Sequence, residues 1–253
     1  MSTLFVAWQS PAPTRAWFPI GRLDAENNDK FSFGYTRGAL DAQRESGFEP
    51  LVSFPKFEDR YESNELFPVF KNRVLDPSRK DFAEYLGWLD LDPLHADPIE
   101  ILALTGGERQ TDSLEVFPKI IKHADNSFTC RFFLHGLRHV SEAARMRATK
   151  LREREPLQVA IELNNPATEI AIQLQTADCH LIGWAPRYLV ADLLDAIQVH
   201  PLVEATVERN NQIAAPLARR VLIELKGQLP QNYEPMTSNQ FQLIAASTPL
   251  GTE

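Results

Sequence analysis

Arg131-Phe-Phe-Leu-His-Gly-Leu-Arg-His139 opens the part of the chain that decides the fold. Two further stretches follow it, Leu163-Asn-Asn-Pro-Ala-Thr-Glu-Ile-Ala-Ile172 and Leu181-Ile-Gly-Trp-Ala-Pro-Arg-Tyr-Leu189. Short apolar runs bounded by Gly, Asn and Pro are typical of strands joined by turns. We expect the first strand to begin at Phe128 and to run to about Gly136, with Arg138 and His139 on its continuation. Asn164-Asn165-Pro166 predicts the turn between two later strands.

The rest of the second half alternates between strand and helix patterns. Further strands are expected at Pro156–Leu163, Ile170–Leu174, Leu181–Trp184, Leu202–Val207 and Val221–Leu225. Ser141 can cap a basic helix that runs to about Glu155, with Met146 and Leu151 facing inward. A second helix is expected over Pro186–Ile197.

The first half predicts a small sheet and two helices. Strands are expected at Leu4–Trp8, Ala16–Ile20, Phe31–Tyr35 and Leu114–Phe117, with an extended run at Pro50–Pro55. One helix would begin at Asp76 as N-cap, with Pro77 in its first turn. The other would span Pro98–Thr105 and end at Gly106-Gly107.

These patterns predict an α+β protein of three parts. A sheet-plus-helices domain would span residues 1–122, a domain of strands and two helices residues 123–230, and a C-terminal tail residues 231–253. The polar segment 122–127 marks the boundary, since its composition is that of a connecting turn.

Composition favours a globular protein without a membrane span. The 253 residues are 43% hydrophobic and 24% charged, and no apolar run is long enough to cross a bilayer. The first nine residues lack the basic and apolar regions of a secretory signal. Cys130 and Cys179 lack metal or redox spacing, so free thiols in a cytoplasmic protein are expected.

Charge is distributed unevenly along the chain. The net charge is −8, which argues against a general nucleic-acid binder. Residues 131–226 hold 12 basic and 11 acidic residues, so the remaining segments carry a net charge of −9. A nucleic-acid contact in the second half is therefore permitted.

Taken in order, three motifs of the second half resemble a HIRAN domain, over about residues 128–226. They are Gly136-Leu-Arg-His139, Asn165-Pro-Ala-Thr168 with Ala171-Ile172 after it, and Gly183-Trp-Ala-Pro-Arg187. The sequence departs from the family pattern at His139, where tyrosine is frequent, and at Ala167 and Thr168, where an aromatic residue and aspartate occur.

The resemblance implies an OB-like β-barrel that holds single-stranded DNA, in some members by its 3′ end. Cations would bind phosphate, and flat rings would stack on bases. The implied DNA-binding residues are Arg138, His139, Asn165, Trp184 and Arg187. Ala167 and Thr168 leave open whether a 3′ end is held.

Each of these residues also has a purely structural interpretation. Arg138 can pair with a surface carboxylate, Trp184 can be a core aromatic, and Arg187 can be solvated in a first helical turn. Asn165 can cap its own turn. The cations between Ser141 and Glu155 can form a solvated face that acidic neighbours partly neutralise.

The first half, over about residues 4–118, is similar to the small N-terminal subdomain of HipA-type toxin kinases. The similarity lies in the order of Gly21-Arg-Leu23, Phe31-Ser-Phe-Gly-Tyr35, Pro50-Leu-Val-Ser-Phe-Pro55, Leu66-Phe-Pro-Val-Phe-Lys-Asn-Arg73 and Ile101-Leu-Ala-Leu-Thr-Gly-Gly107. In those kinases this subdomain is an accessory, and the catalytic core follows it. No such core follows here, so kinase activity is not expected.

No other catalytic motif is present, and the cluster of Asp90, Asp92 and Asp97 is expected to be a solvated loop, with a metal site as the alternative. Gly106-Gly107 lacks phosphate-loop spacing, and the six histidines form no metal-ligand pattern. We therefore expect a bacterial, non-enzymatic protein without cofactor or metal. It would bind single-stranded DNA or DNA 3′ ends and contact a protein partner through its first half. The alternative is a protein–protein regulator, antitoxin-like or toxin-associated, whose barrel has lost DNA binding.

Overall fold

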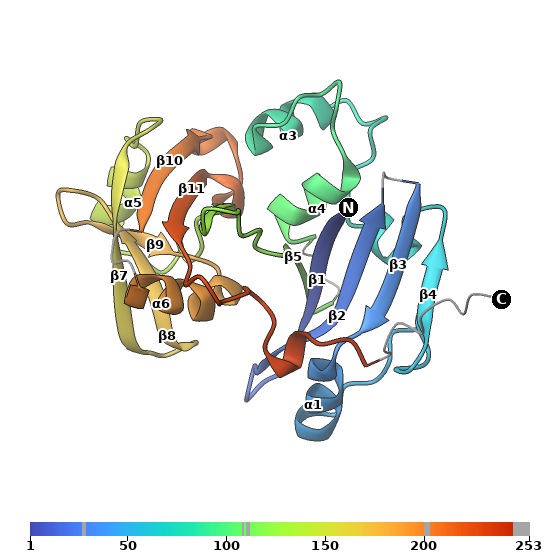
Figure 1. Cartoon of the computed structure of the whole chain (residues 1–253). Helices are drawn as coiled ribbons and strands as arrows, with labels where there is room; N and C mark the ends of the chain where they lie inside the picture. Colours follow the sequence, from blue (N-terminus) through green and yellow to red (C-terminus); the bar gives the residue numbers. More distant parts are fainter. Residues whose placement is uncertain (27–28, 108, 110–111, 200–202, 245–253) are drawn as a thin grey trace. The chain divides into compact units, whose positions relative to one another are not determined.

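A computed structural model describes residues 1–26, 29–107, 109, 112–199 and 203–244 of the chain. The chain forms two compact units (Figure 1). The first unit consists of Met1–Asp76, Asp97–Lys119 and Met236–Glu253, and the second of Pro77–Ala96 and Ile120–Pro235. Each unit is described by itself below.

The first unit is built on a five-stranded antiparallel sheet with the order β4-β3-β2-β1-β5. Its strands are β1 (Ser2–Gln9), β2 (Trp17–Glu26), β3 (Lys30–Tyr35), β4 (Arg60–Ser63) and β5 (Leu114–Pro118). Its helices are α1 (Arg37–Ser46), α2 (Pro68–Lys71), α4 (Pro98–Thr105) and the 3-10 turn η4 (Asn239–Phe241).

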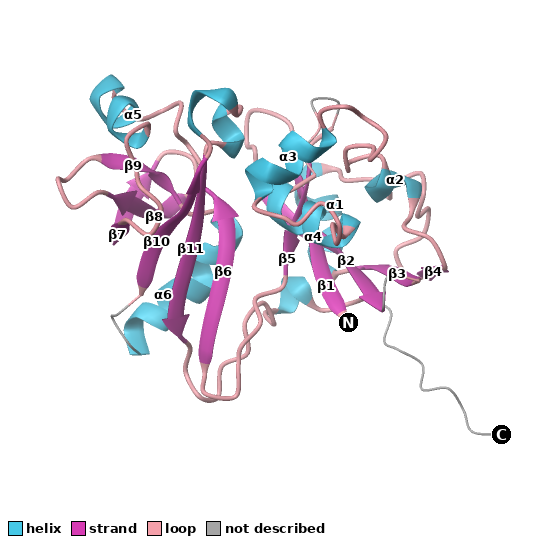
Figure 2. Cartoon of the chain, turned by 90° about the horizontal axis from the view of Figure 1, so that it is seen from above, coloured by secondary structure: helices cyan, strands magenta, loops and turns pink. Residues whose placement is uncertain are grey.

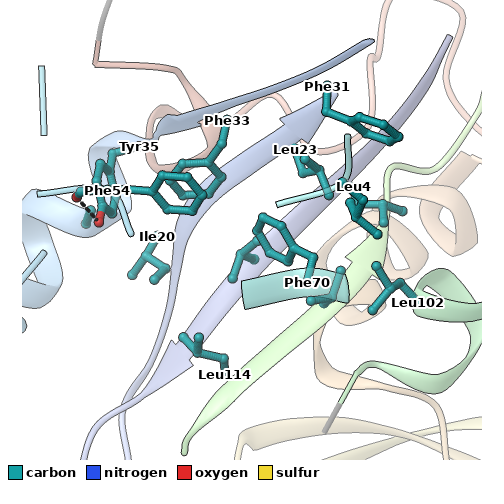
Figure 3. Packing of buried hydrophobic residues seen from close by; sticks show 14 of the residues in the cluster. Leu4, Ile20, Leu23, Phe31, Phe33, Tyr35, Phe54, Phe70, Leu102 and Leu114 are labelled. Carbon is teal, nitrogen blue, oxygen red and sulfur yellow. Dashed lines mark hydrogen bonds between the residues drawn. The ribbon is translucent and has the colours of Figure 1, made fainter. Parts of the chain in front are cut away.

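Aromatic side chains fill the core of the first unit (Figure 3). Phe33 from β3 stacks on Phe54 with ring centroids 4.0 Å apart, and Phe70 from α2 lies 5.9 Å from Phe33. Leu102 of α4 belongs to the same cluster, as does Leu4 of β1. Burial of such large apolar surfaces is the main driving force for this unit.

One buried hydroxyl fixes the loop after α1 onto this core. Tyr35 is 1% exposed, and its hydroxyl donates to the carbonyl of Phe54 at 2.8 Å and accepts from the N–H of Leu51 at 2.6 Å. Desolvation raises the pKa of Tyr35 to about 12, so the hydroxyl keeps its proton. The loop at Leu51–Phe54 therefore depends on a single side chain for two of its backbone hydrogen bonds.

The C-terminal segment returns to the first unit. The N–H of Ile244 donates to the carbonyl of Tyr35, and the N–H of Arg37 donates to the carbonyl of Gln242. Phe241 packs edge-on against Phe5, with ring centroids 4.8 Å apart. Of the residues predicted as a C-terminal tail, 231–235 thus belong to the second unit and 236–244 to the first.

The second unit is built on a six-stranded antiparallel sheet with the order β6-β11-β10-β7-β8-β9 (Figure 2). Its strands are β6 (Ser127–Phe133), β7 (Pro156–Asn165), β8 (Glu169–Gln175), β9 (Leu181–Trp184), β10 (Glu204–Asn210) and β11 (Val221–Gln228). Its helices are α3 (Phe82–Leu89), α5 (Glu142–Ala148), α6 (Val190–Val199) and the 3-10 turns η1 (Arg187–Leu189), η2 (Gln212–Ala214) and η3 (Leu217–Arg219).

The segment that carries α3 belongs to the second unit although it lies early in the sequence. Asp90 at the end of α3 accepts from Arg209 of β10 at 2.5 Å, and Asn211 donates to the carbonyl of Trp88. The predicted division at residue 122 lies close to the entry into the second unit at Ile120. It differs from the structure because residues 77–96 and 236–244 each cross it.

The predicted α+β class is confirmed, since the described residues form two antiparallel sheets and few helices. The OB-like β-barrel expected for the second half is not found as a closed barrel in the described part of the chain. Among the residues that the structure describes, the edge strands β6 and β9 share no ladder. A single antiparallel bridge between His135, just after β6, and Trp184 in β9 links the two edges. The sheet is therefore open, with its two edges joined at one point.

Several predicted elements are shorter than expected, and two helices and one strand are missing from the prediction. The helix predicted from Ser141 to about Glu155 is α5, which ends at Ala148, and Met146 faces outward with 55% exposure. Helix α3 begins at Phe82 because the residues from Pro77 to Asp81 form turns. Pro50–Pro55 forms turns and bends. Helices α1 and α2 and strand β4 were not predicted.

None of the helices in the described part of the chain has the length and apolarity to span a membrane. Both cysteines are free thiols, Cys179 exposed and Cys130 half-buried.

We predict that Tyr35→Phe lowers the free energy of unfolding of the first unit by about 1–3 kcal/mol. The substitution keeps the ring but leaves a buried carbonyl and a backbone N–H without their partner. Urea denaturation measures the effect.

Tyr61→Phe is the matched control, because the hydroxyl of Tyr61 makes the same pair of backbone bonds to Lys56 at an exposed position. We expect a change within about 0.5 kcal/mol for this variant. Equal effects of the two substitutions would show that the Tyr35 hydroxyl does not hold the loop.

Candidate nucleic-acid interface

Two glycines and a tryptophan form the point where the two edges of the second sheet meet. His135 and Trp184 exchange two backbone hydrogen bonds of 3.0 Å each. The indole of Trp184 lies against Gly136, where a β-carbon would come within 2.3 Å of the ring. A β-carbon on Gly183 would come within 2.4 Å of the His135 carbonyl oxygen. The first and third sequence motifs are thus two sides of one contact, which we call the Gly–Trp bridge (His135, Gly136, Gly183 and Trp184).

The N–H group of the Trp184 indole is hydrogen-bonded to a carboxylate. Nε1 of Trp184 donates to Oε2 of Glu162 in β7 at 2.5 Å, and the tryptophan remains partly exposed. Desolvation raises the pKa of this carboxyl, but three hydrogen bonds lower it to below its usual value. The donors are Asn165, Trp184 and Gln173. The Glu162 carboxylate is therefore ionised at neutral pH, and its negative charge beside the Trp184 ring disfavours a phosphate at the same position.

Asn165 caps the β7–β8 turn. Its Oδ1 accepts from the backbone N–H groups of Ala167 and Thr168 and from the Thr168 hydroxyl. Its Nδ2 donates to Glu162 at 2.9 Å. The structure thus brings Asn165 to Trp184 through their shared carboxylate, and both ends of its amide are already engaged. This geometry is the turn-capping alternative left open by the sequence.

Arg138 and His139 lie in a turn and not on a strand, which corrects the sequence prediction. Strand β6 ends at Phe133, and the N–H of His139 donates to the carbonyl of Gly136 at 2.8 Å. Leu137 and Val140 are buried and anchor the turn, so the two side chains between them are exposed. Nε of Arg138 donates to Nε2 of His139 at 2.9 Å. No carboxylate among the described residues pairs with Arg138.

A further arginine, which the sequence did not single out, lies close to the bridge. The pKa of His135 is lowered, first by desolvation and then by the positive charges of Arg219 and Arg187. The Arg219 guanidinium also lies 5.2 Å above the ring of Phe133. Arg187 follows Trp184 by three residues, but Arg219 is more than 80 residues from His135 in sequence. No local pattern could have placed Arg219 here.

Most of the five predicted DNA-binding residues therefore gather around the Gly–Trp bridge. Trp184 is part of it, Arg138 and His139 follow it in the next turn, and the positive charge of Arg187 helps to lower the pKa of His135. Asn165 reaches it only through Glu162. The alternating pattern of β7 could have indicated Glu162, since it is the only charged residue of that strand.

The basic segment after Ser141 is partly neutralised. Arg147 is paired with Glu155 and with Asp178, so it belongs to a local ion-pair network. A cavity of about 500 Å³ follows α5, lined by Arg147, Lys150, Arg152, Glu153, Arg154 and Glu155. Its mixed charge fits the solvated-face interpretation better than a continuous track for phosphates.

The described part of the chain holds no group of three or more His, Cys, Asp or Glu side chains placed to bind a metal ion.

Comparison with known proteins finds no related sequence and one weak structural similarity. No protein-family model and no curated protein matches the chain. Among solved structures, the crystal structure of the HIRAN domain of human HLTF matches with a TM-score of 0.31 and 17% sequence identity. The match covers 48% of this chain and 98% of that domain. A TM-score at this level establishes neither a shared fold nor a shared ligand, and the resemblance to HipA-type kinases stays a prediction.

We predict that Gly136→Ala lowers the free energy of unfolding of the second unit by about 3 kcal/mol or more. The residue has φ of 75°, which costs a side chain about 1–2 kcal/mol, and the added methyl would overlap the indole. Urea unfolding followed by amide signals of each unit measures the loss.

Gly47→Ala provides the comparison, because Gly47 has φ of 69° but nothing within 4 Å of its would-be β-carbon. It should cost the first unit only about 1–2 kcal/mol, from the backbone alone. Losses of the same size at both glycines would contradict the close packing of Trp184 on Gly136.

Proposed function

We propose that the second unit binds single-stranded DNA at the surface around the Gly–Trp bridge, and that the chain has no catalytic activity of its own. The observation that carries the proposal is the partly exposed indole of Trp184 one turn away from Arg138, whose guanidinium no described carboxylate neutralises. A flat ring beside cations is the arrangement that holds an unpaired nucleotide.

Each group has a specific task in this proposal. Trp184 stacks on a base, and its Nε1 stays bonded to Glu162, which fixes the orientation of the ring. Arg138 and Arg187 contact successive phosphates, and His139 adds a second, smaller ring. The sequence resemblance to HIRAN domains agrees with these roles.

The geometry favours a continuous strand over capture of a 3′ end. Asn165 and Thr168 bond to each other, so neither is prepared to receive a terminal sugar without giving up a bond of the turn. The carboxylate of Glu162 repels the phosphate of any DNA strand that approaches the Trp184 ring from the side on which Glu162 lies. We therefore expect similar affinity for free and blocked 3′ ends.

We predict that Arg138→Ala weakens binding of a fluorescein-labelled oligo-dT about 5- to 20-fold at 50 mM salt. Loss of one phosphate contact should also reduce the slope of log K against log salt by about 0.7. Fluorescence anisotropy at several salt concentrations gives both quantities.

Arg44→Ala is the matched control for this experiment. Arg44 is exposed on α1 of the first unit and is paired with Asp41 and Glu45, so its removal should leave affinity and slope unchanged. The proposal fails if the wild-type protein does not bind oligo-dT at 50 mM salt, or if the two arginine variants behave alike.

A second candidate function is a protein-interaction role for the first unit. A cavity of about 560 Å³ there is lined by apolar residues, including Trp8, Phe48 and Val52, together with polar ones such as Glu49 and Asp112. Val52 is 99% exposed, which is unusual for a large apolar side chain beside other apolar residues. A partner with an apolar anchor would remove this surface from water.

Val52→Asp tests this role through co-purification of partners from cell extract. We expect the variant to retain less than a tenth of the protein captured by the wild type, with DNA binding unchanged. Capture at the wild-type level would show that the cavity is not the interface.

A further inference from the structure

Within the described part of the chain, strand β7 is paired on only one side along most of its length. It pairs with β8 from Gln158 to Asn165, but on its other side β10 pairs only with Pro156 and Leu157. Among the strands that the structure describes, none lies along the remaining edge. The backbone groups on such an edge are a template for a further strand.

The same stretch carries an uncovered apolar stripe. Val159, Ile161 and Leu163 alternate along one face, and Ile161 and Leu163 are 45% and 68% exposed. Their cross-strand neighbours differ in burial, since Ile172 beside Ile161 is fully buried whereas Ile170 beside Leu163 is 37% exposed. The apolar face of the hairpin thus continues beyond the part of the sheet that is covered.

The edge also lacks the features that usually protect one. Residues 158–163 contain no Lys and no Pro, and no bulge interrupts them before Leu163. Their only charge is Glu162, which points to the opposite face and is bonded to Trp184 and Asn165. An edge of this kind is normally paired or covered.

We propose that the occupant is a second copy of this chain, joined by antiparallel pairing of β7 with β7 and centred on Ile161. In this register Ile161 lies opposite Ile161 of the second copy, Val159 opposite the second copy's Leu163, and Ala160 opposite the second copy's Glu162. All three apolar side chains of the stripe then pair with apolar side chains.

Three other registers of the β7–β7 pairing are unfavourable. A pairing centred on Glu162 would place two carboxylates directly opposite each other, which is unfavourable. One centred on Ala160 would leave Leu163 opposite Leu157, whose edge β10 already occupies. Shifting one β7 strand by a single residue against the other would place the apolar side chains of one copy on the same face of the sheet as the polar side chains of the other.

A two-fold dimer satisfies both free edges at once and leaves no open end, whereas head-to-tail addition would not close. The dimer would not cover the DNA surface proposed above, because side chains at Trp184 and Glu162 lie on the other face of the hairpin. Each dimer would then present two copies of the Gly–Trp bridge. The dimer does not depend on the proposed function.

Disulfide trapping tests the register directly. Ile161→Cys in a Cys179→Ser background should form a covalent dimer under mild oxidation, because directly opposed residues lie within the Cα separation that a disulfide allows. Cys130 can remain, since desolvation and then the charge of Asp192 raise the pKa of its thiol to about 12.

Ala160→Cys in the same background is the matched control. In the proposed register its copy lies diagonally opposite, about 7–8 Å away, so it should trap at least tenfold less dimer. Equal trapping at the two positions, or none at Ile161→Cys, would overturn the proposed pairing.

Sedimentation of the unmodified protein completes the test. We expect a reversible dimer at tens of micromolar and at least a tenfold weaker association for Leu163→Lys, whose exposed position leaves the fold intact, as circular dichroism can verify. A wild-type protein that stays monomeric at 100 µM would overturn the proposal.

Discussion

Two hydrogen bonds between His135 and Trp184 hold the edges of the second sheet together, and they can form only where β-carbons are absent. Gly136 allows the indole to lie on the backbone, and Gly183 allows the backbone to approach the His135 carbonyl. Without this contact the six strands would form an open sheet with two separate edges. The turn that carries Arg138 would then have no fixed relation to the tryptophan, so the proposed binding surface depends on the same contact.

The polar partners of the tryptophan limit what this surface can bind. Glu162 fixes the ring but adds a negative charge beside it, and Asn165 uses its amide to close the β7–β8 turn. Because both ends of the Asn165 amide are bonded within the hairpin, Asn165 cannot bind a ligand without breaking one of these bonds. The positive charges of Arg219 and Arg187 act on His135 in the Gly–Trp bridge, and Arg138 lies in the turn that follows the bridge. A strand bound as proposed would run along these arginines.

Local patterns predicted the elements that local interactions form. The alternation in Pro156–Leu163 and the Asn165-Pro166 turn are confirmed as the β7–β8 hairpin, because side-chain period and turn chemistry determine it. Strand β4 was missed because Arg60-Tyr-Glu-Ser63 has no apolar run and depends on pairing with β3. Helix α1 was missed because it buries only Gly38, Ala39 and Ala42, which give a weak apolar pattern. The site itself depends on contacts across 48 residues from Gly136 to Trp184, which no local pattern encodes.

The most direct measurement is the indole N–H spectrum of the protein during titration with oligo-dT. The chain has four tryptophans, and Trp184→Phe assigns the signal of Trp184 by its loss. If the strand stacks at the Gly–Trp bridge, the Trp184 signal shifts with increasing DNA while those of Trp8 and Trp17 in the first unit do not move. Binding that leaves the Trp184 signal in place, or that shifts only the tryptophans of the first unit, would contradict the account.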